Sequence, residues 1–341
     1  MKKIFRYLTL VLTTALVLTS CNGKKTRQQF LSNITGKAGE VVIVLDKGNW
    51  EGAVGTVLRD SLAADTPFLP QREPLFSLIY APQQTFTNLL LFHRNIIMLN
   101  ISPSVTEPGI IYQKDLWASP QTVIRINAAD SETAVKLIQE NCATIITTLE
   151  QAERDRIIRN VRRYQETKLV PYVTDMVGGS PYFPSGYQLK KKTSDFIWIE
   201  YAIQYVTQGI FVFKYPVVEG EQMLSLDNIL EHSNEMLKNN VPGMFDNTYM
   251  MISDFARPSI EYMRYKGIDF AEVRGFWEVY NDYMGGPFVT HAFYSQDGKE
   301  VIVLQAFVYA PKYDKRQYLR QVESVIYSFE WAKDEKEANK E

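Results

Sequence analysis

Three side chains near the C-terminal end could together perform general acid–base chemistry. Glu278, Asp282 and His291 lie within a short stretch of the sequence. A carboxylate that accepts a hydrogen bond from one ring nitrogen of a histidine orients the ring, and the other nitrogen can then take a proton from a substrate. Such a group would suit hydrolysis, and these residues are the candidate catalytic set.

The same residues also have a structural interpretation. Glu278 alternates with aromatic residues along an expected strand, and acidic residues on such a face commonly point to solvent. His291 alternates with Val289 and Phe293, which is typical of a half-buried structural histidine. The pattern favours this interpretation, so no catalytic residue is assigned from the sequence.

Other motifs for catalysis or for metal binding do not occur in the sequence. His93, His232 and His291 lie in unrelated contexts, and none belongs to an H-E-x-x-H zinc motif. The stretch Gly178-Gly179-Ser180-Pro181-Tyr182 lacks the second glycine of a G-x-S-x-G nucleophile elbow. No G-x-x-x-x-G-K-[ST] phosphate loop is present either. We therefore expect no cofactor and no metal.

A long amphipathic helix is expected near the middle of the chain. Apolar residues recur at steps of three and four from Ala134 to Ala152, and the pattern continues to about Tyr164. Cys142 lies on this apolar stripe, which favours a small buried side chain over a reactive thiol. Cys142 is also the only cysteine after Cys21, so a multi-cysteine metal site is excluded.

The second half of this helix is rich in arginine. Glu150 with Arg154, and Asp155 with Arg159, are spaced four residues apart in the favourable order. This spacing favours a solvated face of paired charges. The alternative is a basic patch that contacts anionic lipid or a partner.

The N-terminus has the pattern of an export signal. Lys2, Lys3 and Arg6 precede an uncharged apolar run from Leu8 to Leu18. This run is shorter than the roughly 17–25 residues that span a bilayer, but it is typical of a signal-peptide core. It ends in Leu18-Thr19-Ser20-Cys21, which resembles the bacterial lipobox. The resemblance implies cleavage before Cys21 and lipid on that cysteine, and the alternative is an ordinary secretory peptide.

The residues after Cys21 bear on the destination of the protein. Some lipoproteins that stay in the inner membrane have aspartate directly after the cysteine, whereas this chain has Asn22. Surface-exported lipoproteins of Bacteroides-type bacteria often have acidic residues in this stretch, which is basic here. By this resemblance we expect an outer-membrane protein that faces the periplasm, with surface exposure as the alternative.

Composition indicates a globular body that is weakly acidic. The 341 residues are 45% hydrophobic, 13% aromatic and 22% charged, and the net charge is −2. Removal of the signal peptide takes away three positive charges, which makes the body more acidic. An acidic exported protein is a poor candidate for nucleic-acid binding, so no nucleic-acid partner is expected.

The chain divides into five segments by pattern. Residues 1–20 are the signal peptide, residues 21–37 a lipidated tether, and residues 332–341 a disordered charged tail. Residues 38–165 form an N-terminal α+β domain that ends in the long helix, and residues 166–331 a C-terminal antiparallel-sheet α+β domain. The expected fold class is therefore α+β, with two α/β-sandwich-like domains whose sheets are mostly antiparallel.

Hydrophobic periodicity and turn residues place the elements of both domains. In the first domain the expected strands are 41–45, 75–80, 95–101 and 122–126, and the expected helices are 49–64 and 83–91. In the second domain the expected strands are 195–203, 209–215, 249–253, 259–266, 270–280, 288–295 and 301–309, and the expected helices are 226–238 and 314–329. Asp297-Gly298 suits the turn of a hairpin between the last two strands.

Two resemblances cover parts of this pattern. Residues 182–187, residues 209–213, and the closing hairpin and helix through Phe329 resemble the PsbP and Mog1-like scaffold. That resemblance spans about half the chain and implies an antiparallel sheet between helices in a protein that binds or assists assembly. From the lipobox to Trp331, the chain resembles an uncharacterised lipoprotein family of Bacteroides-type bacteria (domain of unknown function family 4837). This second resemblance implies no activity.

Two functional hypotheses follow. The first is a membrane-anchored, non-catalytic envelope module that binds an envelope protein, glycan or lipid partner through its aromatic-rich sheet or its domain junction. The second is an envelope hydrolase that acts on cell-wall or carbohydrate substrates through carboxylates, with Glu278, Asp282 and His291 as its residues. The sequence favours the first hypothesis, because no nucleophile motif is present.

Overall fold

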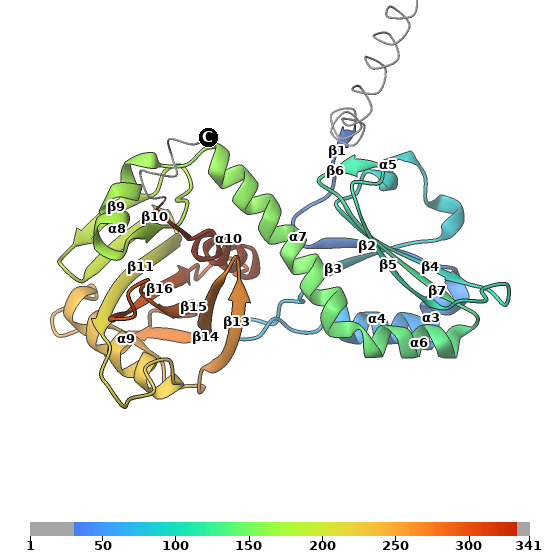
Figure 1. Cartoon of the computed structure of the whole chain (residues 1–341). Helices are drawn as coiled ribbons and strands as arrows, with labels where there is room; N and C mark the ends of the chain where they lie inside the picture. Colours follow the sequence, from blue (N-terminus) through green and yellow to red (C-terminus); the bar gives the residue numbers. More distant parts are fainter. Residues whose placement is uncertain (1–30, 333–341) are drawn as a thin grey trace, which may run out of the picture. The chain divides into compact units, whose positions relative to one another are not determined.

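The structure is a computed structural model that describes residues 31–332 (Figure 1). These residues form two compact units. The first unit contains residues 31–63 and 76–152, and the second contains residues 64–75 and 153–332. Cys21, part of the predicted tether and most of the predicted tail lie outside the described residues.

The first unit is built on a five-stranded sheet with strand order β3-β2-β4-β7-β5. Its strands are β2 (Glu40–Val44), β3 (Ser77–Ala81), β4 (Asn95–Ile101), β5 (Gly109–Lys114) and β7 (Thr122–Ala128). Its helices are α3 (Lys47–Glu51), α4 (Ala53–Leu62), η2 (Gln83–Thr85), α5 (Asn88–Leu91) and α6 (Ser131–Glu140). A separate parallel pair joins β1 (Ser32–Asn33) to β6 (Ala118–Ser119).

The sheet of the first unit is mixed. Strands β3, β2, β4 and β7 run parallel, and only β5 at the edge is antiparallel. Parallel neighbours need a crossover connection, and α3 with α4 supplies one between β2 and β3. The expected α+β class is confirmed, but this sheet is mostly parallel where the sequence pattern predicted mostly antiparallel strands.

The expected long helix is two helices. Helix α6 ends at Glu140, and α7 (Cys142–Arg163) begins two residues later. Asn141 separates them, because its side-chain amide donates a hydrogen bond to the carbonyl of Leu137 (2.8 Å) and caps α6. Although α7 is long, no helix within residues 31–332 combines the length and the apolar character that crossing a membrane requires.

The second unit is built on an eight-stranded antiparallel sheet that curls into a half-barrel. The strand order is β12-β14-β15-β16-β11-β10-β9, and β13 also pairs with β14. The strands are β9 (Gln188–Lys192), β10 (Phe196–Ile203), β11 (Val206–Pro216), β12 (Met250–Ile252), β13 (Ser259–Tyr265), β14 (Ile268–Val279), β15 (Gly285–Tyr294) and β16 (Glu300–Tyr309). The helices are η3 (Thr167–Leu169), α8 (Val170–Val177), α9 (Leu226–Asn240) and α10 (Arg316–Tyr327), and β8 (Gly179–Ser180) pairs with β17 (Glu330–Trp331).

Both faces of this sheet are covered. Alternate residues of β10, β11, β14, β15 and β16 belong to two separate cores, because successive side chains of a strand point to opposite faces. Val322 and Ile326 of α10 pack into one core, and Ile229 and Leu237 of α9 pack into the other. The interpretation of residues 195–203 as a strand covered on both sides is therefore confirmed.

The predicted hairpin joins β15 to β16. The strands pair from Phe288 with Phe307 to Tyr294 with Val301. In the turn, only Gly298 has a positive φ (+71°), and the backbone N–H of Ser295 bonds the carbonyl of Glu300 (2.9 Å). The turn is thus longer than a two-residue hairpin loop.

Residues 64–75 belong to the second unit, where they contact the start of α10. The two oxygens of the buried Glu73 carboxylate accept hydrogen bonds from the backbone N–H groups of Lys315 (2.6 Å) and Arg316 (2.9 Å). A carboxylate is favourable there, because the first turn of a helix has unpaired N–H groups and a partial positive charge. This contact helps to position α10 and the polar residues that it carries.

Candidate functional site

The three residues that the sequence singled out do not come together. His291 and Glu278 lie on the adjacent strands β15 and β14, but the register pairs His291 with Glu272 instead. Because Glu278 is six residues further along β14, it lies roughly 20 Å from that pair. Asp282 lies in the turn after β14, where its carboxylate accepts a hydrogen bond from the backbone N–H of Tyr283 (2.6 Å). The structure therefore brings neither carboxylate to His291.

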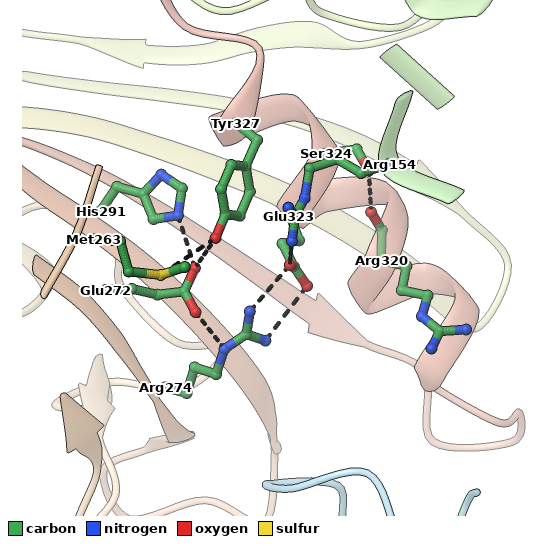
Figure 2. Close-up of polar contacts among 9 residues, drawn as sticks. All are labelled: Arg154, Met263, Glu272, Arg274, His291, Arg320, Glu323, Ser324 and Tyr327. Atoms are coloured by element: carbon green, nitrogen blue, oxygen red, sulfur yellow. Dashed lines mark hydrogen bonds and ion pairs between the residues drawn. The ribbon is translucent and has the colours of Figure 1, made fainter. Parts of the chain in front are cut away.

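His291 instead belongs to a polar cluster inside the second unit (Figure 2). We call this group the buried polar cluster, and it comprises Arg154, Glu272, Arg274, His291, Glu323 and Tyr327. These residues come from α7, β14, β15 and α10. The side chains of Glu272 and His291 are only 5% and 4% exposed, so their polar groups need partners within the protein.

Glu272 is the central acceptor of the cluster. One of its carboxylate oxygens lies 3.1 Å from Nε2 of His291 and accepts a hydrogen bond from the Tyr327 hydroxyl (2.7 Å). The other oxygen accepts a hydrogen bond from Nε of Arg274 (2.7 Å). Three donors from three different elements therefore meet at one carboxylate.

Glu323 is the second acceptor. Its carboxylate oxygens lie 3.0 and 3.4 Å from the two terminal nitrogens of Arg274. One of them also accepts a hydrogen bond from Nη2 of Arg154 (2.8 Å). The guanidinium of Arg154 also lies 3.5 Å from the centre of the Tyr327 ring, which is a cation–π contact. Arg274 thus bridges the two carboxylates, as Figure 2 shows.

The charges of the buried polar cluster balance when His291 is neutral. Two guanidinium groups, Arg154 and Arg274, face two carboxylates, Glu272 and Glu323. Burial lowers the pKa of His291, although the contact with Glu272 opposes this shift. A neutral ring can still donate its Nε2 hydrogen to Glu272. The cluster is therefore complete without a positive charge on the histidine.

The carboxylates are held in their charged form. Burial alone would raise the pKa of Glu272, but Arg274 and the hydrogen bonds from His291 and Tyr327 outweigh it and leave the pKa well below its ordinary value. Burial would likewise raise the pKa of Glu323, and its contacts with the two arginines lower it. Both groups are thus anionic at neutral pH.

Elementary periodicity explains how the chain aligns these side chains. Glu272 and Arg274 are two residues apart on β14, so they point to the same face of the sheet. Glu323 and Tyr327 are four residues apart on α10, so they lie on one side of that helix. The sequence therefore contained a signal for this cluster, because charged residues occupy positions that the periodicity of β14 and α10 assigns to the interior.

The space beside His291 is small. A cavity of about 20 Å³ lies next to the ring and is lined mainly by apolar residues of β13 to β15 and α10. Such a volume holds about one water molecule. This cavity by itself is therefore too small for a substrate.

A larger hollow opens on the surface of the second unit. It has a volume of about 450 Å³, and we call it the basic hollow. Its lining residues are Asp155, Ile158, Arg159, Arg162, Arg163, Tyr265 and Lys266. The last turns of α7 supply the arginines, and the turn between β13 and β14 supplies Lys266.

The arginines of α7 do not all lie on the solvated face that the spacing favoured. Arg154 is directed inward to Glu323, and Arg156 pairs with the buried Glu153 at 3.0 Å. Arg159 and Arg163 are exposed. Some arginines of α7 therefore point into the interior, and others line the basic hollow.

The remaining histidines have separate structural contacts. In the first unit, His93 lies between Glu40 (3.3 Å) and the carbonyl of Asn95 (3.2 Å). In the second unit, the His232 ring stacks on Tyr215 with ring centres 3.8 Å apart. Over residues 31–332, no three His, Cys, Asp or Glu side chains are grouped so that they could hold a metal ion.

We expect the second unit to lose stability in two stages on acidification. The pKa of His291 is lower in the folded chain than its ordinary value of 6.5, so the unfolded chain takes up the proton first and stability falls as the pH drops below about 6.5. The folded pKa of Glu272 and that of Glu323 lie below 4.5, so their stabilising contribution is complete above that pH and is lost progressively as the pH falls from 4.5 toward the folded pKa values. Urea unfolding at a series of pH values measures both stages.

His291→Gln isolates the first stage. Glutamine keeps an N–H donor for Glu272 but does not titrate. The stability difference between the native chain and this variant should narrow between about pH 7 and pH 5, since only the native chain is penalised by protonation there. A difference that stays constant over this range would show that His291 does not titrate differently on folding.

Comparisons with known proteins identify two domains of unknown function. Residues 34–162 match DUF8532, and residues 166–328 match DUF4837. No curated protein matches the chain. The boundary between the two matches lies at the end of α7.

Similar solved structures are distant. One is a crystal structure of a protein from Bacteroides thetaiotaomicron, which is 10% identical, with 46% of each chain covered and a TM-score of 0.21. Another is the human StarD13 (DLC2) lipid transfer and protein localization domain, which is 9% identical over 42% of this chain and 89% of that chain, also with a TM-score of 0.21. The chain thus spans less than half the length of the Bacteroides protein, and at these scores neither structure indicates a function.

Proposed function

We propose that this chain is a lipoprotein of the bacterial envelope, anchored through lipid on Cys21, whose body binds a partner without catalysis. The export pattern of residues 1–20 and the lipobox resemblance support the anchor. An outer-membrane position facing the periplasm is the favoured location, because Asn22 and the basic stretch after it match neither the retained nor the surface-exported pattern.

The observation that carries the non-catalytic proposal is the internal balance of the buried polar cluster. Glu272 and Glu323 are each held by guanidinium groups of the chain itself, and Arg274 lies between them. The cavity beside His291 is about 20 Å³. Groups arranged in this way stabilise the fold, and they are not positioned to act on an external molecule.

The alternative is an envelope hydrolase that works through paired carboxylates. Such enzymes place two carboxyl groups about 5–10 Å apart on either side of a bond in an open site. Glu272 and Glu323 face a shared guanidinium instead. Glu278 does not contact His291, and its carboxylate accepts a hydrogen bond from the Ser253 hydroxyl (2.5 Å) elsewhere on the sheet. These contacts favour binding over hydrolysis.

A comparison of turnover tests the choice between binding and hydrolysis. The full chain and the variant Glu278→Gln/Asp282→Asn/His291→Gln are incubated with cell-wall fragments and with a panel of glycans. We expect no product above background from either protein, because the three residues do not converge. Product formation that the triple variant loses would overturn the non-catalytic proposal.

Capture from living cells tests the binding itself. Cells that express the full chain are crosslinked, and the lipidated protein is isolated with whatever is attached to it. A reproducible envelope protein, glycan or lipid would support a binding module. Its identity would then be checked by the loss of capture after substitutions on the surface that it contacts.

A further inference from the structure

The basic hollow has an excess of positive charge that the fold does not neutralise. Four cationic side chains line it, and Asp155 is the one carboxylate in its lining. Among the described residues, Arg159 and Arg163 have no ion-pair partner, and both are exposed. Positive groups that gather around one concave surface raise the local concentration of anions.

The other two cations have contacts within the fold. The guanidinium of Arg162 lies over the Tyr182 ring at 5.4 Å from its centre. Lys266 is in the two-residue turn between β13 and β14, and its amine lies 3.4 Å from a carboxylate oxygen of Glu330. Two separate segments of the chain therefore present cations to the same hollow.

Helix stability accounts for only part of this arrangement. Cations in the last turn of a helix interact favourably with its negative end, which explains Arg162 and Arg163 at the end of α7. It does not explain the hollow that opens between these residues and Lys266, which comes from the turn between β13 and β14. A ligand in the hollow would account for this arrangement.

We propose that the basic hollow binds a phosphoryl group, and this proposal deepens the proposed binding function by naming the chemistry of the partner. A phosphate monoester has three acceptor oxygens and a charge of about −1.5 to −2, whereas a single carboxylate has two oxygens and one charge. Arginine forks match phosphate oxygens in pairs. A volume of about 450 Å³ is enough for a small organic phosphate.

The phosphoryl group has two sources, a lipid headgroup and a soluble phosphate ester. Arginine labelling with phenylglyoxal, read residue by residue by mass spectrometry, distinguishes them on the full chain. The chain is reconstituted in phosphatidylcholine vesicles and in vesicles that also contain phosphatidic acid, whose headgroup is a phosphate monoester, and each kind is labelled with and without added inorganic phosphate. Anchoring is the same in all of these vesicles, so labelling of the hollow reports on the site alone.

We expect Arg159 and Arg163 to be protected, with labelling roughly tenfold slower when the probe is at about ten times its dissociation constant. Arg257 is the internal control, because it is exposed and lies outside the hollow. Protection by inorganic phosphate in phosphatidylcholine vesicles supports a soluble phosphate ester, and protection by phosphatidic acid alone supports a lipid headgroup. Equal protection of Arg257, or no protection of Arg159 and Arg163 by either probe, would overturn the proposal.

A matched pair of variants separates a specific site from general charge. In Arg159→Gln/Arg163→Gln, labelling of Arg162 should become insensitive to the probe that protects it in the native chain. In Arg257→Gln, the protection of Arg162 should persist. If the chain leaves the neutral vesicles altogether, the proposed anchor fails, and labelling in solution with inorganic phosphate still decides the site.

Discussion

Glu323→Gln is expected to lower the free energy of unfolding of the second unit by about 3 to 5 kcal/mol. The substitution keeps the shape of the side chain but removes the charge that faces Arg154 and Arg274. Glu272 alone would then face two guanidinium groups, and the excess positive charge would be held where the Glu323 side chain is only 11% exposed. Urea unfolding, followed by amide exchange in peptides from β14 to β16, reports on this unit separately from the first.

Glu300→Gln is the matched control for this prediction. Glu300 pairs with Lys214 at 3.0 Å, but its side chain is 37% exposed. Solvent screens such a pair, so the same chemical change should cost no more than about 1 kcal/mol. Similar losses for Glu323→Gln and Glu300→Gln would mean that water screens the buried polar cluster, and the account of its balanced charges would be wrong.

A double variant shows whether Arg154 and Glu323 act as a pair. Arg154→Met with Glu323→Gln removes one charge of each sign and leaves Arg274 with Glu272, which are 2.7 Å apart. The loss should be smaller than the sum of the two single losses, because neither remaining charge lacks a partner. Additive losses would indicate that Arg154 contributes mainly through its contact with the Tyr327 ring.

The sequence predicted the regular part of the second unit well. The strands expected at 195–203 and 301–309 are β10 and β16 with bounds that differ by one residue or less, and the helix expected at 226–238 is α9 with two more residues at its end. The two strands have strong alternation and the helix has an apolar stripe, because their apolar side chains are buried in the cores on the two faces of the sheet. Where burial is complete, the pattern and the fold agree.

The elements that were missed lack this signal. Strand β9 has the sequence Gln-Leu-Lys-Lys-Lys and lies at the edge of the sheet, where charged residues are common and only one neighbour is paired. Strand β5 is also an edge strand. The parallel order of the first sheet was not predicted, because pairing direction depends on which strands become neighbours and alternation carries no information about that choice.

The candidate residues Glu278, Asp282 and His291 do not come together, for a related reason. Distance along the chain suggested that Asp282 and Glu278 would orient His291, but strand register decides which residues face each other. The partner of His291 is Glu272, nineteen residues away, and the cluster is completed by Glu323 more than fifty residues later in α10. The arginines of α7 were noticed in the sequence, whereas Lys266 could be placed beside them only by the turn between β13 and β14.

Cys21→Ala is expected to release the protein from the membrane fraction almost completely. Acyl chains contribute about 0.8 kcal/mol for each buried CH2 group, and two or more chains together make a stable anchor. Alanine has no thiol to carry them. Separation of membranes from soluble envelope contents, with detection of the full chain in each, measures the change.

Cys142→Ala is the matched control for the anchor. Cys142 is a free, partly buried cysteine at the start of α7, so its substitution removes a thiol without touching the lipobox. It should leave the protein in the membrane fraction, and the mass of its N-terminal peptide should still include the acyl chains. If Cys21→Ala also stays with the membrane after a high-salt wash, then another part of the chain holds it there. The basic hollow would be the first surface to substitute in that event, since salt weakens the attraction between its cations and anionic headgroups.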